Sequence, residues 1–168
     1  MERRVSIITL LCVFFLAHGS LLGAFTADKR DTLRGLTQLG VLLEFLPDDL
    51  EREGINRNQL KREIETRLMN AGVHVLTTAE VATLPGAPYI YVSIASLPTT
   101  NAHEYVLIFA LKQLVHLARD PVSELFVTTW ETSAAIRTNG GGHGLDIKSR
   151  LSGALERFLI DYRAVNRK

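Results

Sequence analysis

Residues 104–130 read EYVLIFALKQLVHLARDPVSELFVTTW, and the structure that this stretch adopts decides the fold. As a strand, residues 104–118 place alternating side chains such as Tyr105, Leu107 and Phe109 on one face. A helix is also acceptable there, because leucines and Lys112 suit helices. The Asp and Pro within residues 119–121 are typical of a turn between antiparallel strands. We therefore favour two antiparallel strands, and the helical alternative stays open for residues 104–118.

Strand and helix patterns alternate in the residues before this pair. Residues 36–46 form an apolar run that predicts a buried strand, and residues 47–56 predict a polar connection. Residues 57–72 have an amphipathic helical pattern, which Asn56 can cap and Gly72 can end. Residues 73–76 and 89–96 predict two further strands, with a short helix in residues 77–84 between them.

Residues 145–165 predict a final helix with an apolar stripe. The stripe consists of Leu145, Lys148, Leu151, Leu155, Phe158, Leu159, Tyr162 and Val165, of which only Lys148 is polar at its tip. Asp146 or Ser149 could cap the start of this helix. The order of elements predicts an α+β two-layer sandwich: a mixed, mostly antiparallel sheet of about five strands with two main helices packed on it.

The N-terminal residues predict export from the cytoplasm. Arg3 and Arg4 precede an apolar run, and small residues follow it, which is the order of a secretory signal peptide. Residues 1–24 are therefore predicted as a signal peptide, cleaved after residue 19 or after residue 24, and residues 25–168 as a single domain. An uncleaved anchor is the alternative, because residues 5–25 nearly span a bilayer. The only cysteine, Cys12, lies in this run, so the mature chain can form no disulfide and has no thiol nucleophile.

The charge of the mature chain is close to zero. The full chain of 168 residues has 19 Lys and Arg against 18 Asp and Glu, and removal of Glu2, Arg3 and Arg4 leaves both totals at 17. Nucleic-acid binding needs clustered positive charge, so we expect no nucleic-acid partner. Near neutrality also disfavours adhesion to anionic lipid headgroups, so we expect membrane contact only through an uncleaved N-terminus.

Five segments occur in a recognisable order: AGVHVLTTAEV (71–81), PGAPYIYVSI (85–94), LKQLVHLARDP (111–121), TTW (128–130) and FLIDYRAVN (158–166). Together they resemble a family of small exported bacterial proteins of unknown function, across residues 33–166. The first half also resembles βαβ units of bacterial envelope assembly and secretion proteins, which implies contacts with other proteins. Neither resemblance implies an active site or a ligand. The chain departs from the family pattern at Ala118 and in its long glycine run.

That glycine run, NGGGHG at residues 139–144, lacks the Gly-Lys-Ser/Thr step of a phosphate-binding loop. Asp146 would also repel a phosphate there, so a mobile connection is expected. The histidines of the mature chain are His74, His103, His116 and His143, and their spacing predicts no metal site. His143 is the best candidate for a functional base, acting with Asp146 or a distant carboxylate in a small hydrolase or transferase.

We predict a partner-binding surface that contains Tyr89, Tyr91, Trp130 and His143, because exposed aromatic side chains grip protein or glycan partners. The alternative is that the aromatic residues fill the core. The pattern as a whole predicts a periplasmic or secreted, non-catalytic binding or accessory protein of the bacterial cell envelope. We expect it to use no cofactor and no metal, and to bind an envelope protein. A homo-oligomer and the enzymatic alternative with His143 stay open.

Overall fold

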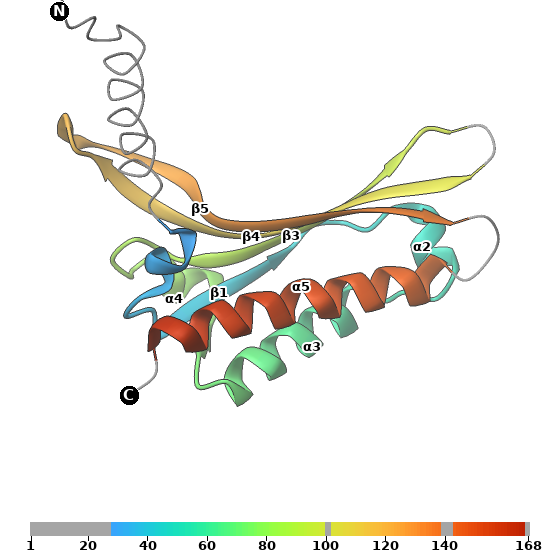
Figure 1. Cartoon of the computed structure of the whole chain (residues 1–168), viewed down its shortest axis with the longest axis horizontal. Coiled ribbons are helices and arrows are strands. Elements are labelled where there is room, and N and C mark those ends of the chain that lie inside the picture. The colour runs from blue at the N-terminus through green and yellow to red at the C-terminus, as the bar shows by residue number, and fades with distance from the viewer. Residues whose placement is uncertain (1–27, 100–101, 139–142, 167–168) are drawn as a thin grey trace, which may run out of the picture.

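The computed structural model describes residues 28–99, 102–138 and 143–166, which form an α+β fold around one sheet (Figure 1). In chain order the elements are η2 (Lys29–Leu33), β1 (Gln38–Leu43), α2 (Asp48–Arg52), α3 (Arg57–Asn70), β2 (His74–Leu76), α4 (Thr78–Val81), β3 (Tyr89–Leu97), β4 (His103–Leu117), β5 (Asp120–Thr138) and α5 (His143–Asn166). The sheet has five strands in the order β2-β1-β3-β4-β5. β1 pairs in parallel with β2 and β3, and β3, β4 and β5 pair antiparallel, so the predicted mixed sheet is confirmed.

Residues 104–118, which the sequence left open between strand and helix, belong to a strand. β4 pairs with β5 along almost its whole length, from His103 opposite Thr138 to Leu117 opposite Asp120. The turn is formed by residues 118–119, so it begins one residue earlier than the predicted turn at residues 119–121, and Asp120 already belongs to β5. The register shifts between Leu111 and Lys112, where β5 contains one extra residue. This β-bulge reverses which face the side chains of β5 point to.

The helix α3 has the ends that the sequence predicts. Asn56 accepts a hydrogen bond from the backbone N–H of Gln59, at 3.0 Å, and so caps the first turn. Gly72 follows the helix with a φ of 86°, the left-handed conformation that glycine adopts without a steric penalty. Leu60, Ile64 and Leu68 are the buried residues of α3, which fixes the helix against the sheet.

The helix α5 begins earlier than predicted and buries a different first turn. It starts at His143, so Asp146 and Ser149 lie within the helix and cap nothing. Leu145, expected in the apolar stripe, is 74% exposed, whereas Ile147 is fully buried. The remainder of the stripe packs as predicted, with Leu151, Leu155, Phe158, Leu159 and Tyr162 all buried.

The core lies between one face of the sheet and the two long helices. Figure 1 shows α3 and α5 side by side along this face, and Arg67 of α3 contacts Glu156 of α5 at 2.7 Å. The strands contribute alternating buried side chains to this core. These are Leu39, Val41 and Leu43 of β1, Ile90, Val92 and Ile94 of β3, Tyr105, Leu107, Phe109 and Leu111 of β4, and Trp130 and Ile136 of β5.

Two short elements were not predicted. The polar connection at residues 47–56 contains the helix α2, and residues 29–33 form the 3-10 helix η2 against β5. No helix in the described part of the chain is long and apolar enough to cross a bilayer. The predictions of a signal peptide, its cleavage site and an uncleaved anchor fall on residues 1–25, outside the described residues. The glycines at positions 140–142 also lie outside them.

Candidate functional site

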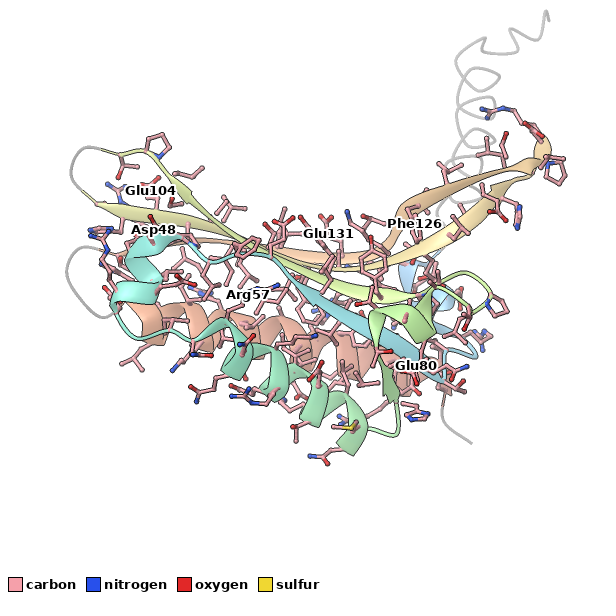
Figure 2. The ribbon with its side chains drawn as sticks, turned by 180° about the vertical axis from the view of Figure 1, so that it is seen from behind. Asp48, Arg57, Glu80, Glu104, Phe126 and Glu131 are labelled. Carbon is pink, nitrogen blue, oxygen red and sulfur yellow. The ribbon has the colours of Figure 1, made fainter. Side chains whose placement is uncertain are left out.

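The opposite face of the sheet is the first candidate site, and within the described part of the chain most of it carries no helix. Its side chains come from alternating positions of β1, β3, β4 and β5; we call this set the open face. It consists of Leu42, Glu44, Tyr89, Tyr91, Ser93, Ile108, Lys112 and Phe126. Figure 2 shows Phe126 and Glu131 on the side of the sheet away from α3 and α5. Five of the eight side chains of the open face are apolar or aromatic, so this surface suits a partner better than water.

The aromatic rings of the open face are held by specific contacts. Tyr89 meets Phe126 edge to face, with ring centroids 5.8 Å apart. The ammonium group of Lys112 lies 4.2 Å from the centroid of the Tyr91 ring, which is a cation–π contact. Phe126 is 54% exposed despite its contact with Tyr89. The rings are therefore fixed in position yet still accessible.

The charged group Glu44 is tied to the same rings. Hydrogen bonds from the hydroxyls of Tyr91 and Ser93 hold the pKa of Glu44 below its ordinary value. The same hydrogen bond to Glu44, together with burial, raises the pKa of Tyr91. At neutral pH the open face therefore carries an ionised carboxylate, a neutral tyrosine and an ammonium group in a row. These polar groups can orient a polar side chain of a partner that also contacts the apolar residues of the open face.

One end of this face is covered by α4. A Cβ atom on Gly40 would lie 2.7 Å from Cγ2 of Val81, so only glycine lets α4 pack this closely on β1. A capping box between Thr77 and Glu80 fixes the start of α4. The helix leaves a shallow, mostly apolar hollow beside Leu42 and Tyr89. Across β3, β4 and β5 the sheet is bent, because the β4–β5 hairpin and the β3–β4 hairpin both curve away from α5 (Figure 1).

The second candidate site lies at the far end of the sheet, where His143 begins α5. His143 is only 4% exposed, and both of its ring nitrogens are occupied. Nδ1 lies 2.5 Å from the Thr138 hydroxyl, and Nε2 lies 3.2 Å from Oε1 of Glu53. The other oxygen of Glu53 accepts the backbone N–H of Gly144 at 2.9 Å. Glu53 therefore binds both the imidazole and the N-terminus of α5, where helices attract negative charge.

A second histidine and a second carboxylate adjoin this group. The ring of His103 lies on that of His143, with centroids 4.1 Å apart, and its Nδ1 is 3.5 Å from Oδ2 of Asp49. The hydroxyl of Tyr105 donates to the same Asp49 oxygen at 2.5 Å. Burial acts to raise the pKa of Asp49, but hydrogen bonds from Tyr105, backbone N–H groups and His103 outweigh it and lower that pKa. Burial and the bond to Asp49 raise the pKa of Tyr105.

This arrangement corrects the expectation that His143 lies on a mobile connection. His143 is instead a buried helix residue, and its carboxylate partner is Glu53 from the residues after α2. Asp146, the near carboxylate expected to act with it, lines a different hollow beside β5. No group of three His, Cys, Asp or Glu side chains within residues 28–99, 102–138 and 143–166 is arranged to hold a metal ion.

The four residues predicted for partner binding lie in three places. Tyr89 and Tyr91 are neighbours on the open face. Trp130 faces the core, is 1% exposed and donates from Nε1 to Oδ2 of Asp161 at 2.9 Å. His143 lies at the far end of the sheet. The structure thus brings the two tyrosines together and separates them from Trp130 and His143.

Several residues of both sites were missed by the sequence analysis. Alternation along β5 places Phe126 on the same face as Trp130, and the bulge near Lys112 overturns this. Lys112 was considered only as support for a helix. Glu53 and His103 have no local signal, because α2 and β4 bring them to His143 from segments far apart in the sequence.

Comparisons with known proteins assign no function to either site. No family model matches the chain, and no curated protein matches it. Among solved structures, lipoprotein GNA1162 from Neisseria meningitidis is similar, with 14% identity over 74% of this chain and 99% of its own, and a TM-score of 0.37. The hypothetical protein CT253 from Chlamydia trachomatis is similar with 11% identity over 76% of this chain and 94% of its own, and a TM-score of 0.36. These neighbours are bacterial proteins, but scores this low assign the chain to no family.

Proposed function

We propose that this protein is an exported, non-catalytic accessory protein of the bacterial cell envelope that holds a protein partner on its open face. The observation that carries the proposal is the exposed aromatic set around Phe126, which the fold fixes in place and leaves uncovered by α3 and α5. The signal-like N-terminal sequence supports a location outside the cytoplasm.

The shape of the open face favours a protein over a small molecule. Small ligands bind in pockets of roughly 300–1,000 Å³ that bury most of their surface, whereas the hollow beside Leu42 and Tyr89 measures only about 130 Å³. Protein interfaces are enriched in Tyr and Phe, and their strongest contacts come from a few such side chains. The hydrogen bond between Tyr91 and Glu44 and the cation–π contact of Lys112 place polar groups beside these rings, and such groups can set the orientation of a bound protein.

A matched pair of phenylalanines tests this proposal. A photo-crosslinking amino acid is introduced at position 126, on the open face, or at position 45, where Phe45 is 85% exposed beneath Arg57 instead. In cells of the producing bacterium, we expect position 126 to crosslink to a defined envelope protein and position 45 to give no such product. Equal crosslinking at both positions, or none at position 126, would refute the proposal.

The second candidate function is a small hydrolase, favoured by the order hydroxyl, imidazole and carboxylate in Thr138, His143 and Glu53. This is the order of nucleophile, base and orienting acid in acyl-transfer enzymes. We place it second because both Thr138 and His143 are buried, so a substrate does not reach the hydroxyl without opening of this end.

An ester-hydrolysis assay decides between the two functions. A hydrolase predicts turnover of p-nitrophenyl esters that falls at least about a hundredfold in a Thr138→Val variant, because the nucleophile is lost. The binding function predicts the same negligible turnover in wild type and variant.

A further inference from the structure

The outer edge of β5 is the longest strand edge without a neighbouring strand in the described residues, and η2 covers it around Thr129 and Glu131 through Thr32 and Lys29. β5 is the terminal strand of the sheet and runs over 19 residues, whereas the other edge strand, β2, has three. Such an edge presents a row of backbone N–H and C=O groups and is a template for another strand.

The hydrogen bonds show which residues of β5 direct these groups outward. The backbone N–H of Leu114 donates to the carbonyl of Gly86, which lies just before β3, at 2.7 Å. Backbone groups alternate in direction along a strand, so even-numbered residues of β4 bond toward β3 and odd-numbered residues bond toward β5. The register then makes Trp130, Thr132, Ala134 and Ile136 bond toward β4. Glu131, Ser133, Ala135 and Arg137 therefore direct their backbone groups outward. The carbonyl of Glu131 confirms this direction, because it accepts a hydrogen bond from Nζ of Lys29 at 2.6 Å; pairing with a further strand replaces this bond.

Space for a further strand exists beside this edge. A hollow of about 470 Å³ lies between Thr132–Ala134 of β5 and the neighbouring side of α5. On the α5 side its middle is lined by the small residues Ser149, Gly153 and Ala154 and by Arg150, while Asp146 and Arg157 lie at its two ends along the helix. The edge is thus accessible on the helix side as well as on the open face.

We propose that the occupant is a second copy of this chain, with its β5 paired antiparallel to β5 on a two-fold axis at Ala134. Ser133 then pairs with the partner's Ala135, and Glu131 with the partner's Arg137. The two sheets join into one continuous sheet. A two-fold interface must be self-complementary, and this register is, because each copy places an acid opposite a base.

The charged side chains favour this register over the registers with the axis one residue earlier or later. Glu131 and Arg137 both lie on the open-face side of β5, and the axis at Ala134 sets them opposite each other twice. An axis at Ser133 or at Ala135 keeps the same backbone bonding but leaves Glu131 without the partner's Arg137. Glu104, 3.3 Å from Arg137, extends each contact into a three-charge group.

The proposed axis also decides how the helices of the two copies meet. The two-fold axis sets α5 antiparallel to the partner's α5 across the hollow. The small residues that line the hollow allow the helices to approach. This inference does not depend on what occupies the open face.

A disulfide at the axis tests the proposal. Ala134 lies at a non-hydrogen-bonded position of the new ladder, where opposite Cα atoms are about 4.5 Å apart, a separation that a disulfide can bridge. The full-length chain carrying Cys12→Ser and Ala134→Cys is expressed in its own bacterium and oxidised mildly. We expect a dimer on a non-reducing gel that reductant abolishes. The control is Ala95→Cys, an exposed position on β3 away from the axis, which we expect to stay monomeric.

A charge variant separates this interface from chance collision. In the Ala134→Cys background, Glu131→Arg sets two like charges against each other and is expected to lower the crosslinked fraction about tenfold. Adding Arg137→Glu restores opposite charges and is expected to restore crosslinking. Absence of the dimer at position 134, equal crosslinking at position 95, or indifference to Glu131→Arg overturns the proposal.

Discussion

The two faces of the sheet are built from the same strands and differ in what they do. On the covered face, Ile90, Val92 and Phe109 are buried under α3 and α5. On the open face, the intervening residues Tyr91 and Lys112 are half-exposed and hold each other through a cation–π contact. Burial of apolar area dominates stability, whereas exposed aromatic residues dominate recognition. We therefore expect changes on the covered face to affect folding and changes on the open face to affect binding.

The largest effect is expected in the aromatic cluster of the covered face. Phe158 packs edge to face on Trp130, with centroids 5.3 Å apart, and also contacts Phe109. Phe158→Ala leaves a cavity in this cluster and is expected to lower the free energy of unfolding by about 3–5 kcal/mol. Urea denaturation followed by Trp130 fluorescence measures it. A loss no larger than that of Phe126→Ala would remove the distinction between the faces.

A smaller effect is expected where α4 covers part of the open face. Gly40→Ala places a methyl group 2.7 Å from Cγ2 of Val81 and is expected to cost about 1–3 kcal/mol. Val81→Ala in the same chain removes the clashing carbon, so the double variant should recover part of the loss. Thermal unfolding of the three variants compares them. If the double variant is less stable than Gly40→Ala alone, α4 does not pack on β1 as described.

Asp49, beside the two histidines at the far end of the sheet, should make the free energy of unfolding depend on pH in the acid range. The lowered pKa of Asp49 in the folded state means that its contribution is present above the pKa of an unfolded aspartate and is lost as pH falls through the folded value. Tyr105→Phe removes a hydroxyl that donates to Asp49, so the acid dependence of unfolding should weaken, and Asp49→Asn should abolish this part of it. Urea titrations between about pH 2.5 and 6 measure the slope. Identical slopes in wild type and both variants would contradict this assignment.

The smallest effect is expected from the cation–π contact of the open face. Lys112→Gln removes the ammonium group over Tyr91 and should lower stability by only about 0.5–1 kcal/mol, because the site is partly solvated. A double-mutant cycle with Tyr91→Leu isolates the coupling between the two side chains. A coupling energy near zero would show that the open face is not held together by this pair.

Much of the fold could be predicted from local pattern. The ends of α3, the capped α4 and the apolar stripe of α5 depend on residues three or four positions apart, so the sequence carries them directly. The two tyrosines of the open face follow from alternation within β3. Trp130 and Phe126 could not be assigned this way, because a single extra residue in β5 reverses the faces between them.

The sequence by itself determined the type and order of most elements and most of the covered apolar faces, because short-range periodicity decides which side chains can be buried together, but it left residues 104–118 open between strand and helix. Only the tertiary structure decided that His103, His143, Asp49 and Glu53 meet, that Phe126 faces away from the core, and that β5 ends the sheet with its edge unpaired in the described residues. These features depend on strand register and on contacts between distant segments. Long-range pairing is selected by the whole packed core, which no window of the sequence contains.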